Sequence, residues 1–269
     1  MIKHLKSVLL KNKIVREKVA NLKMKTVHLK KIKQYEDDTF LVSYPRSGSN
    51  LLRFLIANLI SIHKTSEYLM TFKQARIFMP NFPDKRFDDF FLNLNRPRFI
   101  KTHHAFATIQ FPKVIYIYRD GRDVYYSYFN WGKKQNLIPS NMLFSDFLQE
   151  TLKSQNKWSE HILSWTNKYP EERMLLIKYE DLIKNKLEVL KKVSEFINIP
   201  TNNQVLNQLI DISDFSKMSK TENNKEDVVL NKGTSGGWKK EFSKQDIEVF
   251  KMHENKALIK LGYESSYDW

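Results

Sequence analysis

Cysteine is absent from the sequence, which excludes disulfides, iron–sulfur clusters, thiolate zinc sites and cysteine nucleophiles at once. Long apolar runs are absent as well: no stretch approaches the roughly 18 consecutive apolar residues that a membrane-spanning helix needs. The first six residues, MIKHLK, do not lead into the apolar core of a secretion signal. We therefore expect a protein of the reducing cytoplasm.

Glycine is scarce, with seven among 269 residues. None lies in a GxGxxG dinucleotide-binding pattern or in the Gly-Lys-Ser/Thr pattern of nucleoside-triphosphate loops. The remaining composition is that of a folded chain, with 41% hydrophobic and 28% charged residues. It excludes a wholly disordered or a collagen-like protein, and the length favours one or two domains.

Acidic residues are nearly absent from the first 33 positions, which contain one glutamate, Glu17, and eleven lysines and arginines. This stretch therefore has a net charge of +10, out of +15 for the whole chain. Apolar residues recur there near helical spacing, which predicts a basic amphipathic helix. Such a helix either contacts an anionic membrane surface or packs on the body as a solvated helix, and both interpretations stay open. No aromatic residues alternate with the basic ones, so we expect no specific nucleic-acid partner. We divide the chain into this extension, 1–33, and one domain, 34–269.

The pattern of that domain is one of short apolar runs alternating with helical spacing. Runs rich in branched and aromatic residues predict strands at 39–44, 113–118 and 174–179, with a weaker fourth at 98–101. Helical patterns begin at Leu51 and Phe144. This alternation predicts an α/β fold, a single domain with a mostly parallel central sheet flanked by helices. The polar stretch 223–237, with three of the seven glycines, predicts a loop.

The first chemical motif lies between the strand at 39–44 and the helix that follows. A strand–turn–helix junction aims backbone N–H groups and a positive helix dipole at one point, which favours binding of an anion. Gly48 allows close approach, while Arg46 supplies a charged fork and three side chains add hydrogen-bond donors: Ser47, Ser49 and Asn50. The simpler alternative is a helix N-cap by Ser49 or Asn50. Because the loop lacks the lysine of nucleoside-triphosphate loops, we expect a P-loop-like anion cradle that needs no metal.

The second motif places Lys101, His103 and His104 after the run at 98–101. An imidazole titrates near neutrality and removes a proton from a hydroxyl, and an adjacent cation stabilises developing negative charge. A zinc site needs three or four ligands, and no carboxylate or thiol lies at ligand spacing. A surface pair of histidines remains the alternative.

The third motif places Arg119 at the end of the strand at 113–118, before a helix that carries Ser127. Ligands of open α/β sheets are contacted at the carboxyl ends of parallel strands. The alternative is an ion pair between Arg119 and Asp123 at the start of that helix.

Together these motifs resemble the soluble sulfotransferases that use 3′-phosphoadenosine 5′-phosphosulfate (PAPS). The resemblance runs from about residue 39 to 242 and rests on five ordered segments: YPRSGSN at 44–50, KTH at 101–103, YRDGRDVYYS at 118–127, KYEDL at 178–182 and KGTSGGW at 232–238.

The resemblance implies a role for each matching residue at the donor. The first loop would hold the 5′-phosphosulfate: Arg46, Ser47, Gly48, Ser49 and Asn50. Arg119 and Ser127 would bind the 3′-phosphate, with Lys232 and Gly233 closing over it. The adenosine would be lined by Tyr179, Ser213 and Phe215.

The resemblance also implies the chemistry. His103 would be the general base, with Lys101 and Arg46 as catalytic cations. A hydroxyl or amine acceptor of unspecified class would attack sulfur in line, without a metal ion. Two other classes are weighed against this enzyme: a nucleotide-dependent small-molecule kinase, and an inactive fold that binds nucleic acid or anionic lipid.

The sequence departs from the family pattern at four places. Arg46 stands where the animal enzymes most often have lysine, and the two are not equivalent donors. Leu51, which we place among the cofactor-binding residues, stands where a tryptophan often covers the adenine. Asn231 replaces an arginine that often precedes Lys-Gly. The segment 239–248 lacks the central Thr-Val of the family's dimer motif, so the oligomeric state is left open.

The acceptor side is marked only by aromatic residues. Seven phenylalanines crowd the region between the first two motifs and just after the second, where they would line an apolar pocket or belong to the core: Phe72, Phe78, Phe82, Phe87, Phe90, Phe91 and Phe106. Trp131 and Trp158 are candidates for stacking on a sugar.

Overall fold

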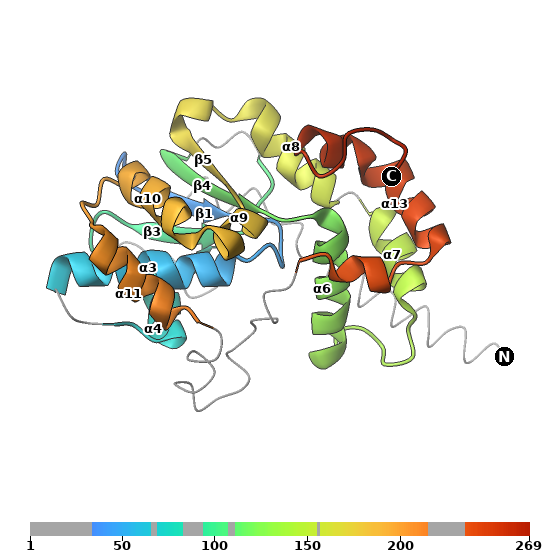
Figure 1. The fold of residues 1–269 in the computed structure, drawn as a ribbon, viewed down its shortest axis with the longest axis horizontal. Coiled ribbons are helices and arrows are strands. Elements are labelled where there is room, and N and C mark those ends of the chain that lie inside the picture. Colours follow the sequence, from blue (N-terminus) through green and yellow to red (C-terminus); the bar gives the residue numbers. More distant parts are fainter. Residues whose placement is uncertain (1–33, 66–68, 83–93, 107–110, 155–156, 215–234) are drawn as a thin grey trace.

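The computed structural model of the chain describes residues 34–65, 69–82, 94–106, 111–154, 157–214 and 235–269 (Figure 1). Their elements, in chain order, are β1 (Thr39–Val42), α3 (Ser49–Thr65), α4 (Phe72–Phe78), β2 (Asn81–Phe82), β3 (Phe99–Thr102), β4 (Lys113–Tyr118), α6 (Gly121–Lys134), α7 (Phe144–Leu152), α8 (Trp158–Lys168), β5 (Met174–Lys178), α9 (Tyr179–Lys184), α10 (Lys186–Phe196), α11 (Asn203–Ile212) and α13 (Lys244–Lys260). The expected basic extension at 1–33 and most of the expected loop at 223–237 lie outside the described residues.

The strands form a parallel sheet in the order β2-β3-β1-β4-β5. β1 is central: Thr39 pairs with Phe99 of β3 on one side and with Lys113 of β4 on the other. Parallel neighbours require crossover connections. In the described residues, α3 and α4 lie between β1 and β2, and α6, α7 and α8 lie between β4 and β5. The prediction of a single α/β domain is confirmed, and the carboxyl ends of β1, β3 and β4 meet at one edge.

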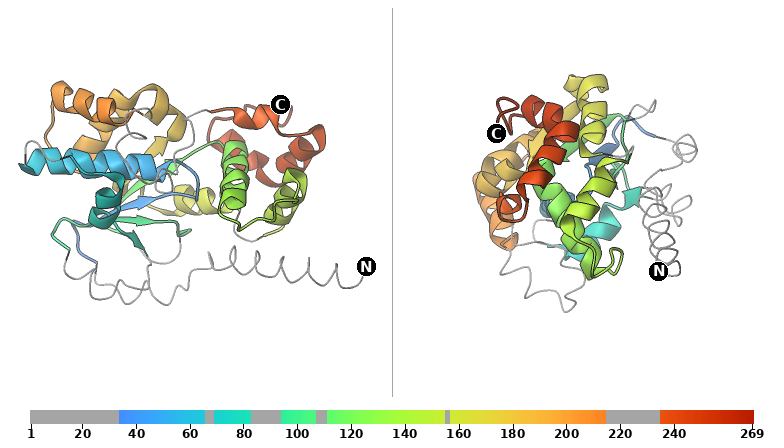
Figure 2. Two further views of the ribbon diagram at one scale, coloured as in Figure 1. Left: turned by 90° about the horizontal axis from the view of Figure 1, so that it is seen from below. Right: turned by 90° about the vertical axis from the view of Figure 1, so that its right-hand side faces the viewer.

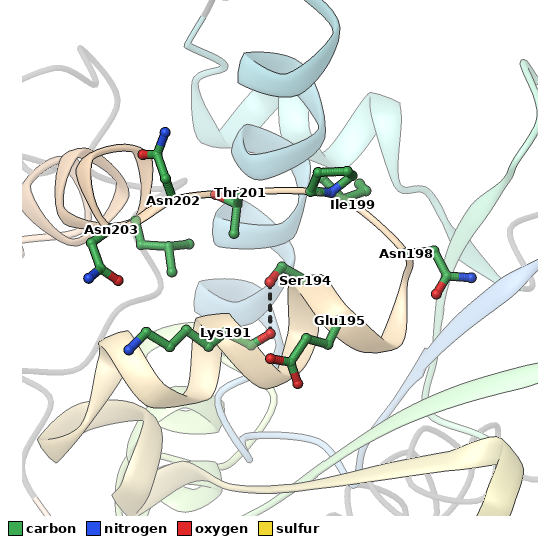
Figure 3. Close-up of a pocket in the computed structure, with 10 residues that line it drawn as sticks. Lys191, Ser194, Glu195, Asn198, Ile199, Thr201, Asn202 and Asn203 are labelled. Carbon is green, nitrogen blue, oxygen red and sulfur yellow. Dashed lines mark hydrogen bonds between the residues drawn. The ribbon is translucent and has the colours of Figure 1, made fainter.

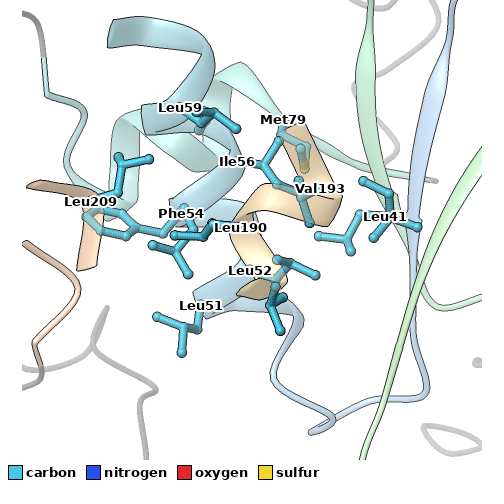
Figure 4. Packing of buried hydrophobic residues seen from close by; sticks show 14 of the residues in the cluster. Leu41, Leu51, Leu52, Phe54, Ile56, Leu59, Met79, Leu190, Val193 and Leu209 are labelled. Atoms are coloured by element: carbon cyan, nitrogen blue, oxygen red, sulfur yellow. The ribbon is translucent and has the colours of Figure 1, made fainter. Parts of the chain in front are cut away.

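Alternate residues of the strands point to opposite faces and build two apolar clusters. On one face, Val42 of β1 and Val114 of β4 pack with α6, α7, α8 and α13. On the other, Leu41 and Ile115 pack with α3, α4, α10 and α11, as Figure 4 shows for Leu41 and its helical neighbours. Figure 1 shows these two helix groups on the right and the left of the view, and Figure 2 shows them from below and from the side.

Element boundaries differ from the sequence-based expectations by a few residues. β1 ends at Val42, before the chain turns into the anion loop, and α3 begins at Ser49 rather than Leu51. Tyr179 is the first residue of α9, not the last of β5. β2 was not predicted, because a two-residue strand carries no alternation that a sequence reveals.

The described members of the phenylalanine cluster belong mainly to the core. Phe72 stacks on Phe54 with ring centroids 4.3 Å apart, and Phe82 is buried. Phe106 packs edge-on against Trp165. Phe87, Phe90 and Phe91 lie outside the described residues. Trp158 is fully buried, which excludes it as a residue that stacks on a sugar, and Trp131 is half-buried beside Arg46.

No helix in the described ranges is long and apolar enough to cross a membrane.

A fully buried carboxyl group joins α13 to α8. Glu254 of α13 accepts hydrogen bonds from the Ser159 backbone N–H (2.8 Å) and from Tyr125 Oη (3.2 Å). Ser159 lies in the first turn of α8, whose N-cap residue, Lys157, makes no side-chain cap bond. Glu254 of α13 therefore provides the acceptor for a free backbone N–H group at the N-terminus of α8. Burial raises the pKa of Glu254 to about 7, against the lowering effect of these hydrogen bonds.

This raised pKa predicts a pH-dependent stability that Glu254→Gln should remove. A carboxyl with a higher pKa in the folded state than in the unfolded state binds more protons when folded, so its contribution to stability falls as pH rises. Between pH 5 and pH 8, wild type should lose about 2 kcal/mol of unfolding free energy relative to E254Q. Urea denaturation of both proteins across this range measures the difference, and a difference that is constant with pH would contradict the prediction.

Candidate active site

The loop between β1 and α3 has the backbone shape of an anion cradle. Arg46 and Gly48 have positive φ values of 70° and 93°, and the N–H groups of Leu51 and Leu52 both bond to the Gly48 carbonyl. A positive φ is strained for arginine, and such strain persists where surrounding structure enforces it, often at functional sites. The side-chain oxygen of Asn50 accepts a hydrogen bond from Arg53 Nη2 at 3.1 Å.

Gly48 is required by the close approach of Tyr179. A Cβ atom at position 48 would lie 2.3 Å from Cδ2 of the Tyr179 ring, which is far inside contact distance. The guanidinium of Arg119 lies over the same ring, 4.7 Å from its centroid. Tyr179, from the start of α9, thus joins the loop to the end of β4.

Positive charge gathers around this loop. Arg46 donates through Nε to Ser127 Oγ of α6 at 3.3 Å and lies over the Trp131 ring. Burial, with the nearby charge of Arg119, lowers the pKa of Arg46 to about 10, so the side chain keeps its charge at neutral pH. The Ser47 hydroxyl is buried and has no hydrogen-bond partner in the described part of the chain. A cradle with crowded cations and an unused buried hydroxyl fits a phosphate or sulfate group.

The end of β3 carries the histidine and lysine of the second motif. His103 Nδ1 lies 2.7 Å from the backbone oxygen of Ser43, just after β1, and His103 Nε2 lies 2.7 Å from Lys101 Nζ. A carbonyl only accepts, so Nδ1 carries the proton and Nε2 presents its lone pair to the ammonium group. Lys101 is buried and His103 is half-buried at the edge where β1 and β3 end.

Burial lowers the pKa of both groups well below their ordinary values. Neighbouring cations add to the effect: Arg53, Arg76 and Arg46 act on Lys101, and Lys101 acts on His103. His103 is thus held as neutral imidazole, the form that accepts a proton.

Arg119 directly follows the carboxyl end of β4, as expected, and the alternative ion pair with Asp123 is present. Its Nη2 lies 3.7 Å from Asp123 Oδ2, so the alternative ion pair exists, but it is longer than a hydrogen bond. The closer contacts of Asp123 are with the backbone N–H groups of Gly236 (2.7 Å) and Trp238 (3.1 Å). Asp123 thus links Arg119 to the segment that follows residues 215–234.

That segment is fixed by a stacked arginine. The Arg122 guanidinium lies 4.1 Å from the Trp238 ring centroid and 4.4 Å from that of Trp269, and it pairs with Asp120 and Glu264. Cation–π stacking between two indoles holds Trp238 in place beside Asp123.

Some of the remaining predicted site residues lie in the described part of the chain, and others do not. Ser213 ends α11 and donates its hydroxyl to the Ile210 carbonyl, while Leu51 packs into the core with α3. Phe215, Lys232, Gly233 and Asn231 lie outside the described residues. Ser49 begins α3 and is buried near the loop.

Sequence reasoning missed several polar residues that touch the site. Arg53 bonds to Asn50 and to Asn81 of β2. His161 of α8 lies 3.1 Å through Nε2 from the His103 carbonyl. A histidine four residues before a tryptophan on an apolar helix face was the only available signal for His161, and it is indistinguishable from a core residue.

A cavity of about 570 Å³ lies between α10 and α11, lined by residues such as Lys191, Asn198 and Asn202 (Figure 3). None of the predicted site residues lines it, so it is separate from the anion cradle. In the described ranges, no three His, Asp or Glu residues group in a way that would hold a metal ion.

Known proteins match this chain over nearly all of the described residues. The family described as "Sulfotransferase domain" matches residues 36–262. Sulfotransferase 6B1 of Danio rerio is 28% identical over 259 residues, covering 89% of this chain and 85% of the relative. Sulfotransferase 2A2 of Mus musculus is 30% identical over 241 residues, covering 80% and 82%.

Solved structures share the fold. Mouse sulfotransferase SULT7A1 complexed with PAP superposes with a TM-score of 0.67 at 24% identity, covering 87% of this chain and 90% of that one. Retinol dehydratase in complex with androsterone and the inactive cofactor PAP gives 0.64 at 19% identity, covering 84% and 82%. The family match and the relatives confirm the resemblance seen in the five motifs: the chain belongs to the sulfotransferase family and is a sulfuryl-transferring enzyme.

Proposed function

We propose that the sulfuryl donor is PAPS, held by adjacent groups at its 5′ end and at its 3′-phosphate. Arg46, Ser47 and the backbone of the 46–50 loop hold the 5′ end, and Arg119 with Ser127 holds the 3′-phosphate. Support comes from the unused Ser47 hydroxyl, the Gly48 cradle against Tyr179, and the crowded guanidinium groups. When bound, PAPS supplies an activated sulfuryl group on a phosphate leaving group. Mouse SULT7A1 and retinol dehydratase, both solved in complexes with PAP, have the same fold.

We propose further that His103 takes the proton of the acceptor hydroxyl or amine at Nε2. The observation that carries this assignment is the 2.7 Å contact between His103 Nδ1 and the Ser43 carbonyl. It fixes the tautomer, and it places the imidazole beside the point where β1 enters the anion loop. General-base catalysis then needs only that Nε2 face the acceptor.

Lys101 controls access to that lone pair. Its ammonium donates to Nε2 at 2.7 Å, so His103 accepts a proton only after Lys101 has turned away. Anionic charge in the cradle attracts Lys101 and stabilises its protonated form, which relieves the unfavourable burial among arginines. Lys101 then stabilises the negative charge that develops during transfer.

The test of this function is turnover with PAPS and a panel of alcohols, phenols and amines in EDTA, with calorimetric binding of PAP as a separate measurement. We expect PAP binding and metal-independent transfer to at least one hydroxyl acceptor. Turnover that needs Mg²⁺ and ATP would identify a kinase instead. Binding of nucleic acid with steep salt dependence, without PAP binding, would identify an inactive fold.

The acceptor class is proposed only as a hydroxyl- or amine-bearing compound. Retinol dehydratase has been solved in complexes with androsterone and with retinol, which are apolar alcohols. A panel that includes sterols, short alcohols, sugars and peptide tyrosine separates the classes.

We also propose that the enzyme acts in the cytoplasm and that residues 1–33 contact anionic membrane. Their ten excess positive charges favour such a surface. The full chain should co-sediment with vesicles containing phosphatidylserine at low salt, whereas a chain beginning at Gln34 should stay in solution and keep its turnover of a soluble acceptor.

Neutral phosphatidylcholine vesicles are the control, since they remove the electrostatic attraction. If the shortened chain is insoluble, the apolar stripe of the extension belongs to the core. If both chains ignore anionic vesicles, the extension is a solvated arm and the membrane proposal is wrong.

A further inference from the structure

The proposed base stands on a segment without regular structure. β3 ends at Thr102, and residues 103–106 are neither helix nor strand. Backbone groups that leave a sheet need other partners when they are buried. Here the partners are side chains of α8.

Three side chains on one face of α8 hold this segment. His161 Nε2 lies 3.1 Å from the His103 carbonyl, and Trp165 Nε1 donates to the His104 carbonyl at 2.9 Å. Between them, Ser164 Oγ accepts from the Phe106 N–H at 2.9 Å. The i, i+3 and i, i+4 spacing places all three on the same face of the helix.

His161 is itself fixed in one protonation state. The His103 carbonyl only accepts, so Nε2 carries the hydrogen and Nδ1 accepts from the Tyr116 hydroxyl at 2.7 Å. Burial lowers the pKa of His161 to about 4, so the ring is neutral at physiological pH. Tyr116 belongs to β4 and is fully buried, so its hydroxyl stands on a rigid strand.

We propose that His161, oriented by Tyr116, is a positioning residue that holds the main chain of His103 so that Nε2 faces the acceptor. Two of the hydrogen bonds of His103 act at different points of the residue. Its ring bonds to the Ser43 carbonyl, and its own carbonyl bonds to His161. Together they fix both the backbone and the side-chain rotation of the base. The inference rests on the proposed role of His103, and it adds a residue that the five motifs do not contain.

The test compares three full-length variants with wild type. His161→Phe keeps a buried ring and removes both hydrogen bonds, while His161→Gln keeps one side-chain N–H donor. Tyr169→Phe is the matched control, because it removes another buried hydrogen bond, from Tyr169 Oη to the Phe111 carbonyl at 2.6 Å, that does not reach His103.

We expect H161F to lower kcat about 10-fold, because small displacements of a reacting group reduce rates by one to two powers of ten. The acceptor KM and the PAP affinity should stay within about twofold, since the positioned group acts in the transition state. The acid limb of the kcat–pH profile should move upward, because a looser His103 ring gains water. H161Q should recover much of kcat, and Y169F should keep wild-type kcat.

Three outcomes would overturn the inference. The first is an unchanged kcat in folded H161F. The second is a rise in acceptor KM alone, which would make His161 an acceptor contact. The third is an equal loss of kcat in Y169F, which would make the effect structural. If H161F does not fold, Tyr116→Phe replaces it. We expect Y116F to lose kcat a few-fold and to shift the acid limb of the kcat–pH profile in the same direction. An unchanged kcat in Y116F would also overturn the inference. His103→Ala, assayed beside them, separates this inference from the proposed function, because an active H103A protein would reject the base itself.

Discussion

His103→Ala should lower turnover by about 100-fold or more while leaving the affinity for PAP nearly unchanged. The expected size follows from general-base catalysis, because the variant loses the imidazole whose tautomer is fixed by the Ser43 carbonyl. The substitution leaves Arg46 and its contact with Ser127 in place, so PAP binding measured by calorimetry should not change. Weaker PAP binding together with lower turnover would show that His103 supports the cradle instead.

His104→Ala is the matched control for this variant. Successive residues at the end of a strand point to opposite faces, so we expect His104 to matter much less. In the structure its ring packs near Phe82 with centroids 5.7 Å apart, and its carbonyl, which the substitution keeps, bonds to Trp165. If H104A were inactive and H103A active, the assignment of the base would be wrong.

The lowered pKa of His103 adds a pH test of the same assignment. A base works only when deprotonated, so its acid limb falls at its pKa. Because burial and Lys101 hold the pKa of His103 below the ordinary value of about 6.5, kcat/KM for PAPS should be constant from pH 7 down to at least 6.5. A fall centred above pH 6.5 would contradict the buried, cation-paired environment.

The sequence was sufficient for the sheet and for the location of the anion loop. The strand Lys113–Tyr118 is a largely apolar run, as a buried parallel strand must be, and its bounds were predicted to the residue, whereas those of β1, β3 and β5 differ by one or two residues. The order of five motifs identified the family, and the first four of them lie at the carboxyl ends of β1, β3, β4 and β5. β2 could not be predicted, since it is held as a strand only by its pairing with Lys101 and Thr102.

The sequence was insufficient for contacts between distant elements. Glu254 is one acidic residue on a largely polar helix, and nothing in its neighbours indicates that it bonds to the first turn of α8, 95 positions earlier. The same holds for His161, whose partner at His103 lies 58 positions away. Polar residues buried at such separations are specified by packing, which local periodicity does not encode.

Arg119 is the second group for which a large effect is expected. Arg119→Ala should weaken binding of PAP, which carries the 3′-phosphate, by roughly 1.5–3 kcal/mol, the range for hydrogen bonds to charged groups. Binding of adenosine 5′-phosphosulfate, which lacks the 3′-phosphate, should hardly change. Calorimetry with the two nucleotides measures the difference.

The contacts of Asp123 decide how this result is interpreted. Removing Arg119 leaves the Asp123 carboxylate with the Gly236 and Trp238 N–H groups, so the segment near Trp238 should stay in place in R119A. Asp123→Asn removes the charge and replaces one accepting oxygen by a donor, so it should disturb that segment and weaken both nucleotides alike. A selective loss in R119A beside an unselective loss in D123N would assign the 3′-phosphate to Arg119. Equal losses of both nucleotides in R119A would show that the arginine acts only through its 3.7 Å pair with Asp123.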